Sequence, residues 1–237
     1  MAKRIDTLKM QVHAVEALRL LHQSFSYSKL EGMLGIPRSV LAQYVTGSRV
    51  PSPGQAALIV ERVLKVVNLA QIITSKLRTM GSIADLEDVV LDPLILNLVS
   101  LWAERRYSGR IDVVLSAETI GIPLATAVAL SLGARLVIAR RRPESTVREY
   151  IRAEAGEPPF EVKVFYIPRD KLPPGLRVLL VDDLARTGIT LEALARGVKR
   201  AGCTVEAAVI IIALGSKWRE RLRRAGVSDV HAFLEIP

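Results

Sequence analysis

Two adjacent carboxylates follow an apolar run in the last third of the chain. Val178–Val181 is apolar, Asp182 and Asp183 come next, and a small, hydroxyl-bearing turn leads to Thr190. Backbone N–H groups of such a turn, with the N-terminus of the following helix, form a cradle for phosphate. Carboxylates repel phosphate but accept hydrogen bonds from sugar hydroxyls, so the segment predicts a ribose 5-phosphate site. The predicted binding residues are Asp182, Asp183, Ala185, Arg186, Thr187, Gly188, Ile189 and Thr190.

This segment resembles the binding motif of the type I phosphoribosyltransferases, which recognise phosphoribosyl pyrophosphate. The family pattern is four apolar residues, two acidic residues, two apolar or small residues, one variable residue, and then Thr-Gly-Gly-Thr. Residues 178–190 fit it at every position except Ile189, which stands where the family has its second glycine. The resemblance implies an α/β fold with a parallel sheet flanked by helices. It also implies a Mg²⁺ ion that is carried with phosphoribosyl pyrophosphate and is not held by protein side chains alone.

A second strand, turn and helix, from Val113 to Ala125, resemble the pyrophosphate-binding loop of the same family. Gly121 permits close packing at the start of the helix. The pyrophosphate-binding residues that the resemblance implies are Ser116, Ala117, Glu118, Thr119, Arg140 and Arg141. Two alternatives remain open: Glu118 is only a charge at a helix N-terminus, and the arginines are only the solvated end of a strand.

The family also has a mobile flap that covers the substrate, and residues 144–159 occupy its place here. We expect this stretch to be loop-like. Orotate-type enzymes place lysines in this region, whereas residues 135–161 contain none. This departure favours a protein that binds the ligand without full catalysis.

A pair of short helices is predicted between Tyr27 and Val45, with a tight turn at Gly35. The pair resembles a helix-turn-helix, whose second helix enters the major groove of DNA. On this interpretation, one group of residues reads base edges: Arg38, Ser39, Ala42 and Gln43. Lys29 and Arg49 would contact phosphates. The alternative is an ordinary helical hairpin used for dimerisation.

The elements that must position these residues divide the chain into two predicted domains, 1–75 and 80–237. The first is all-helical. The second alternates strands with helices, which is typical of a parallel sheet covered on both faces. We expect strands at 111–115, 135–139, 162–167, 177–181 and 205–212, all but the third being parallel and buried. Helices are expected at 121–132 and 189–201, and a further helix carries Trp218.

The composition limits the class of protein. The net charge of +9 indicates an anionic partner, and residues 1–75 carry nine basic but only four acidic side chains. A single cysteine excludes a disulfide scaffold and a cysteine-rich zinc site. We expect no membrane span and, because residues 1–25 lack a signal-peptide core, a cytoplasmic location. The excess of arginine over lysine favours a thermophilic source.

Two functions follow from these patterns. The favoured one is a DNA-binding transcriptional regulator, acting as a homodimer on double-stranded DNA. Its second domain would bind phosphoribosyl pyrophosphate, or a related sugar phosphate or nucleotide, as effector. Residues 34–47 and 50–52 resemble archaeal regulators once labelled orotate phosphoribosyltransferase-like, and the plan is similar to bacterial purine-operon repressors. The alternative is an active orotate- or purine-type phosphoribosyltransferase whose N-terminal helices serve oligomerisation.

Overall fold

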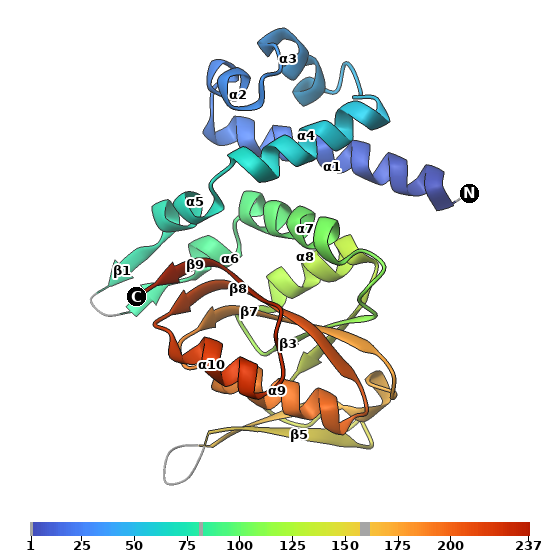
Figure 1. Cartoon of the computed structure of the whole chain (residues 1–237), viewed down its shortest axis with the longest axis vertical. Helices are drawn as coiled ribbons and strands as arrows, with labels where there is room; N and C mark the ends of the chain where they lie inside the picture. Colours follow the sequence, from blue (N-terminus) through green and yellow to red (C-terminus); the bar gives the residue numbers. More distant parts are fainter. Residues whose placement is uncertain (1, 81–82, 157–161) are drawn as a thin grey trace.

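The structure, a computed structural model, describes residues 2–80, 83–156 and 162–237. A helical lobe at the N-terminus packs against an α/β part (Figure 1). The lobe is built from α1 (Ala2–Ser24), α2 (Tyr27–Leu34), α3 (Arg38–Thr46) and α4 (Pro53–Val66). The expectation of helices in this region is confirmed.

Short polar and turn residues set the boundaries of the lobe helices. The Ser26 side chain accepts from the backbone N–H of Lys29 and begins α2, which ends at Gly35 in the left-handed region, with φ of 62°. Ser52 and Gln55 form a reciprocal capping box at the start of α4. After α4 the chain begins a new helix, because Asn68 caps α5 (Leu69–Lys76).

The centre of the α/β part is a parallel sheet with strand order β4-β3-β7-β8-β9. Its strands are β3 (Val113–Ala117), β4 (Arg135–Ala139), β7 (Arg177–Ala185), β8 (Thr204–Leu214) and β9 (Val230–Ile236). Side chains alternate between two apolar cores, as the period of a strand requires. In β7, Val178 and Leu180 enter one core, whereas Leu179 and Val181 enter the other.

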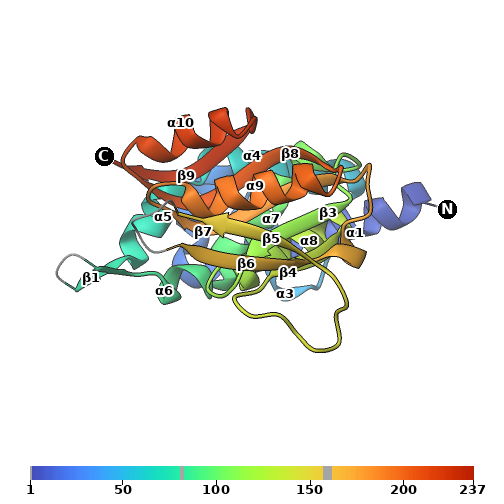
Figure 2. The same ribbon diagram turned by 90° about the horizontal axis from the view of Figure 1, so that it is seen from below.

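A different set of helices and strands packs on each face of the sheet (Figure 2). Side chains of α9 (Ile189–Arg200), α10 (Lys217–Arg224), β5 (Tyr150–Ala155) and β6 (Lys163–Pro168) pack on one face. Side chains of α5, α6 (Glu87–Val90), α7 (Pro93–Tyr107) and α8 (Ile122–Leu132) pack on the other. The expected parallel sheet with helices on both faces is therefore confirmed.

Helix α7 joins the lobe to the α/β part. Leu94, Leu98 and Leu101 on α7 belong to the core of the lobe, whereas Ile95 and Val99 belong to the core beneath the sheet. One face of α7 therefore packs in the core of the lobe, and another face packs in a core of the α/β part. Ile73 of α5 also belongs to the core beneath the sheet.

Several elements differ from the expectations. The stretch 144–159 contains strand β5, paired antiparallel with β6, and its residues 157–159 lie outside the described part of the chain. Ile151, Ala153 and Ala155 are buried and alternate with exposed Arg152 and Glu154, so a period-two pattern was present. Strand β9 and helix α7 were not predicted, nor was the hairpin of β1 (Arg78–Met80) and β2 (Ile83–Asp85). Within the described ranges, no helix combines the length and apolar character needed to cross a bilayer.

Candidate functional site

The strand order identifies where a ligand site belongs. From β3 the chain passes through α8 to β4 on one side, and from β7 it passes through α9 to β8 on the other. The order therefore reverses between the adjacent strands β3 and β7. In open parallel sheets, ligands bind outside the carboxyl ends of the strands at this reversal. The two segments singled out by the sequence begin in the last residues of β3 and β7 and continue into the loops that follow these strands.

Gly121 brings these two loops into contact. A β-carbon at position 121 would lie 3.0 Å from Ser116 Oγ and 3.3 Å from Asp183 Oδ1. It would also lie 3.4 Å from the backbone nitrogen of Asp183. A side chain at position 121 would therefore press on both loops, and glycine permits their close approach.

The two carboxylates differ in their environment. Asp182 is 8% exposed, whereas Asp183 is half-buried, and the Asp183 N–H donates to Asp182 Oδ1 at 3.1 Å. Burial, reinforced by the neighbouring charge of Asp183, raises the pKa of Asp182 well above its ordinary value. Hydroxyl donors from a sugar would relieve the cost of this buried carboxylate.

The turn after β7 has the form of an anion cradle. Gly188 adopts a φ of 74° and precedes the first residue of α9, so the exposed Arg186 and Thr187 lie at a helix N-terminus. Ala185 is buried at the end of β7, and Thr190 is half-buried in the first turn of α9. Ile189 departs from the family pattern, but positive φ occurs only at glycines among the described residues. Ile189 therefore has a negative φ, and its position does not require the backbone freedom of glycine.

Helix α10 packs directly on the turn. A β-carbon at Gly188 would lie 2.9 Å from the Cα of Trp218 and 3.1 Å from its carbonyl oxygen. The Trp218 side chain is buried, and its Nε1–H donates to the carbonyl oxygen of Gly215 at 2.8 Å. The backbone of α10 thus packs against the turn at Gly188. Sequence reasoning missed this contact, because no local pattern relates position 188 to position 218.

A buried carboxylate fixes α10 to α9. Glu192 is 8% exposed and accepts from Arg196 at 2.6 Å and from Arg221 at 2.7 Å. Arg221 comes from α10, whereas Glu192 and Arg196 belong to α9. We infer that this ion-pair network holds Trp218 against Gly188.

The loop after β3 is tied to the end of β4. Ser116 and Ala117 are buried, and Thr119 is exposed. The peptide bond between Glu118 and Thr119 is cis. Glu118 Oε2 accepts from the backbone N–H of Arg141 at 2.8 Å. Glu118 therefore does more than place a charge near α8, because its carboxylate fixes the position of the loop.

Arg140 and Arg141 contact the β5–β6 hairpin. The backbone of Arg140 exchanges two hydrogen bonds with Tyr166, and its Nε pairs with Glu144 at 3.0 Å. The guanidinium of Arg141 lies 5.2 Å from the centre of the Phe165 ring. The end of β4 is thereby fixed against β6, close to the loop after β3.

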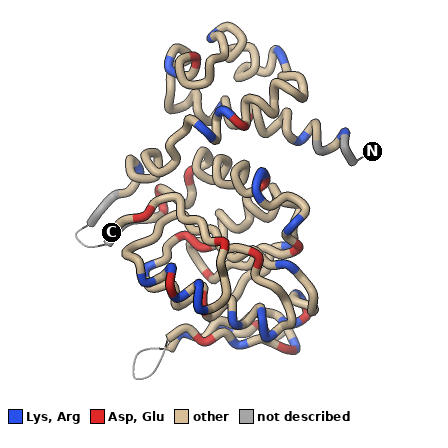
Figure 3. Tube along the Cα trace, viewed as in Figure 1, with Lys and Arg blue, Asp and Glu red and all other residues tan. Residues whose placement is uncertain are grey.

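The predicted DNA-contacting residues lie on the lobe, away from the reversal point. Most are exposed: Lys29, Arg38, Ser39, Gln43 and Arg49. Ala42 is half-buried. The carboxylate of Glu31 accepts from the Arg38 N–H at 3.1 Å and so places a negative charge at the N-terminus of α3. Lys and Arg are spread over both parts of the chain (Figure 3).

The comparisons with known proteins identify the family. The phosphoribosyl transferase domain matches residues 90–231, and the chain belongs to this family. An adenine phosphoribosyltransferase of Anaeromyxobacter sp. (strain Fw109-5) is 34% identical over 154 residues, covering 63% of this chain and 83% of the relative. A hypoxanthine/guanine phosphoribosyltransferase of Methanosarcina mazei is 31% identical over 137 residues, covering 58% of this chain and 70% of the relative.

Solved structures agree on the fold. An adenine phosphoribosyltransferase from Rhodothermus marinus DSM 4252 aligns with a TM-score of 0.62 and 27% identity, covering 71% of this chain and 98% of that one. The same enzyme from Saccharomyces cerevisiae, solved with adenine and a bisphosphate, aligns with a TM-score of 0.61 and 20% identity. It covers 70% of this chain and 98% of that one, and at this identity the likeness shows the fold alone.

The favoured expectation of a DNA-binding transcriptional regulator is wrong. The similar proteins are adenine and hypoxanthine/guanine phosphoribosyltransferases, which support the enzyme alternative. These relatives give no support to double-stranded DNA as a partner or to a helix-turn-helix role for α2 and α3. They also give no support to the expected archaeal or thermophilic source. Two short helices joined at a glycine, with a surplus of basic residues, do not distinguish a DNA reader from an ordinary helical hairpin.

Proposed function

We propose that this chain is an active phosphoribosyltransferase that joins a purine base, adenine first, to phosphoribosyl pyrophosphate. A ring nitrogen of the base forms a bond to C1 of the ribose. The bond from C1 to the pyrophosphate oxygen breaks, and pyrophosphate leaves with the electron pair. The proton on the attacking nitrogen passes to solvent. The products are a purine nucleoside monophosphate and pyrophosphate.

The observation that carries this proposal is the close approach at Gly121, which brings the end of β3, at Ser116, next to Asp183 near the end of β7. Within this arrangement, Asp182 and Asp183 accept from the two ribose hydroxyls. The turn from Ala185 to Thr190 holds the 5-phosphate at the N-terminus of α9. The loop from Ser116 to Thr119 holds the pyrophosphate.

Mg²⁺ enters the proposal with the substrate. Among the described residues, no group of three or more His, Cys, Asp or Glu side chains could hold a metal ion. Mg²⁺ commonly binds substrate phosphates while keeping several waters. The ion would therefore arrive on the diphosphate oxygens and neutralise the charge of the leaving group.

The assembly and division of the chain form a second part of the proposal. We infer a homodimer, with a helical lobe at 1–75 and a transferase part at 80–237. Light scattering on the full chain tests the dimer. Limited proteolysis tests the division, which predicts preferred cleavage between residues 75 and 80.

A panel of bases tests the catalytic proposal. The full chain is incubated with phosphoribosyl pyrophosphate, Mg²⁺ and one base at a time: adenine, hypoxanthine, guanine or orotate. Released pyrophosphate and nucleotide are both measured. We expect sustained turnover with adenine and little with orotate. Absence of turnover with every base would contradict the proposal.

A further inference from the structure

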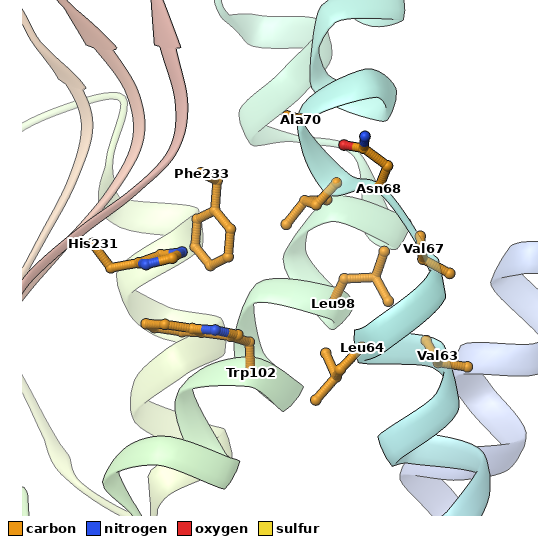
Figure 4. A pocket seen from close by; sticks show the side chains of 10 residues that line it. Val63, Leu64, Val67, Asn68, Ala70, Leu98, Trp102, His231 and Phe233 are labelled. Carbon is orange, nitrogen blue, oxygen red and sulfur yellow. The ribbon is translucent and has the colours of Figure 1, made fainter.

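A cavity of about 260 Å³ lies between the helical lobe and the α/β part (Figure 4). One wall is aliphatic and includes Leu64 and Val67, at the end of α4, and Leu98 of α7. The other wall is aromatic and consists of Trp102 of α7 with His231 and Phe233 of β9. The loops after β3 and β7 do not line it, so this cavity is separate from the proposed transferase site.

The aromatic wall has a fixed geometry. The rings of Trp102 and His231 stack with centroids 4.2 Å apart and planes inclined by 26°. Phe233 meets Trp102 at 5.1 Å and His231 at 4.6 Å, in both cases edge to face. All three side chains remain partly exposed. A preformed aromatic wall opposite an aliphatic wall favours a flat, apolar ligand.

The cavity also offers a few polar groups. Across the part of the chain that the structure describes, neither ring nitrogen of His231 has a hydrogen-bond partner. Burial, followed by the charge of Arg106, lowers the pKa of His231, so the ring is neutral near pH 7 and offers one donor and one acceptor. At the rim, Asn68 uses its Oδ1 to cap α5, at 3.1 Å from the Gln71 nitrogen.

Size and charge narrow the class of ligand. The volume is below the usual ~300–1,000 Å³ of sites for drug-sized molecules, which favours a single fused ring system. The lining residues include no Asp, Glu, Lys or Arg. The nearby Arg106 already pairs with Asp229 at 2.9 Å, so a phosphate group would enter without a lining cation, at a high desolvation cost. A free base suits the cavity better than its nucleotide.

We propose that this cavity is a second ligand site, which binds an uncharged, planar, bicyclic heteroaromatic molecule of the purine-base class. The ring lies between the aromatic wall and Leu64, and His231 recognises its ring nitrogens. Because the walls come from both α4 and β9, an occupied site links the lobe to the α/β part. A ligand that binds only the folded chain raises its unfolding temperature.

Tryptophan fluorescence provides the test. The chain has two tryptophans, so a Trp218→Phe background leaves Trp102 as the reporter. The full chain, without phosphoribosyl pyrophosphate, is titrated with adenine, with indole and with ribose 5-phosphate. We expect saturable quenching by adenine, weaker quenching by indole and none by ribose 5-phosphate. Absence of saturable quenching by adenine, or equal quenching by ribose 5-phosphate, would overturn the proposal.

Two variants of α4 assign the quenching to the cavity. Leu64→Arg places a charged side chain at the cavity wall, and we expect adenine to bind at least tenfold more weakly. Leu58→Arg is the matched control, because Leu58 lies on the same helix, is 44% exposed and does not line the cavity. His231→Phe keeps the aromatic wall but removes its polar atoms, and should weaken adenine more than indole. Equal affinity in Leu64→Arg and Leu58→Arg would contradict the assignment.

Turnover measurements separate this proposal from the transferase proposal. Phosphoribosyl transfer is measured on Leu64→Arg in the chain that keeps Trp218, and retained turnover shows that the variant is folded. Loss of quenching with retained turnover supports a separate second site. Saturable quenching that depends on Leu64, in a protein without turnover, would support the cavity and contradict the transferase function alone.

Discussion

The lobe and the α/β part present similar kinds of sequence signal with opposite outcomes. In the lobe, a glycine turn between two short helices suggested DNA recognition, and the similar proteins overturned that reading. In the α/β part, two carboxylates after a buried strand suggested sugar-phosphate binding, and the chain belongs to the phosphoribosyl transferase domain family. The difference lies in specificity, because many helical hairpins share the first pattern. The second pattern requires a strand, an acidic pair and an anion cradle in a fixed order.

The largest expected effect concerns the acidic pair. Asp182→Asn with Asp183→Asn removes the charged acceptors for the ribose hydroxyls, and hydrogen bonds to charged groups contribute about 1.5–3 kcal/mol each. We expect kcat/KM for adenine and phosphoribosyl pyrophosphate to fall by about 10³-fold. The far-ultraviolet circular dichroism spectrum should be unchanged. Activity within tenfold of the wild type would place the ribose elsewhere.

A second prediction concerns the contact between the phosphate turn and α10. Gly188→Ala places a β-carbon 2.9 Å from the Trp218 backbone, at a φ of 74°. Because the contacting Trp218 atoms belong to the backbone of helix α10, we expect the turn to shift, and a displacement of this kind costs about 10²-fold in rate. Steady-state kinetics should show a higher KM for phosphoribosyl pyrophosphate. Gly133→Ala is the control, since position 133 also has positive φ but has no neighbour within 4 Å. Equal losses of activity in Gly188→Ala and Gly133→Ala would show that backbone strain, and not the contact with Trp218, causes the loss.

A third prediction concerns the network that holds α10. Arg221→Ala leaves the buried Glu192 with only Arg196, and we expect about 2 kcal/mol of lost stability. We also expect an increase in KM for phosphoribosyl pyrophosphate of about tenfold, because Trp218 is released from Gly188. Arg221→Lys should recover part of the loss. Arg224→Ala is the control, because Arg224 pairs with the exposed Glu220 and with no other acidic side chain among the described residues. An unchanged KM in Arg221→Ala would show that the network has no role in positioning the turn.

A fourth prediction concerns the buried carboxyl group by itself. The folded chain raises the pKa of Asp182 above the unfolded value of 3.8, so the folded state holds its proton more tightly. The stabilising contribution is complete below the unfolded pKa and is lost as the pH rises through the folded pKa. At neutral pH, Asp182→Asn should therefore unfold at a higher temperature than the wild type, by about 1–3 kcal/mol in stability. The difference should shrink towards acid pH in thermal melts. A difference independent of pH would contradict the raised pKa.

The smallest effect is expected in the lobe. Arg38→Ala with Gln43→Ala changes two exposed side chains on α3, far from the reversal point between β3 and β7. We expect kcat/KM to stay within about twofold, since surface substitutions seldom change stability or activity much. A large loss of transfer would show that the lobe takes part in catalysis and would end the contrast between the two regions.

Local patterns predicted part of the site, and contacts across the fold supplied the rest. Apolar runs predicted strands up to residues 115 and 181, because buried parallel strands need continuous apolar sequence. The observed β3 and β7 extend further and include Ser116 and Asp182. The same patterns predicted α8 and α9. The alternation of buried and exposed residues in β5 did not lead to a predicted strand, because a flap was expected there. Strand β9 was not predicted.

Contacts between distant residues could not be predicted in the same way. Trp218 contacts Gly188, and Glu118 contacts Arg141, through the tertiary fold, and no local pattern relates these positions. The choice of function failed for a similar reason. A surplus of positive charge on the lobe indicates an anionic partner in general and does not select DNA.

The most direct test of the central claim measures both products of one reaction. The full chain, phosphoribosyl pyrophosphate, Mg²⁺ and labelled adenine are incubated, and labelled adenosine monophosphate and pyrophosphate are quantified together. The account predicts equal amounts of the two products over many turnovers, and their loss in the Asp182→Asn, Asp183→Asn variant. Failure to form labelled nucleotide from adenine, hypoxanthine or guanine would contradict it.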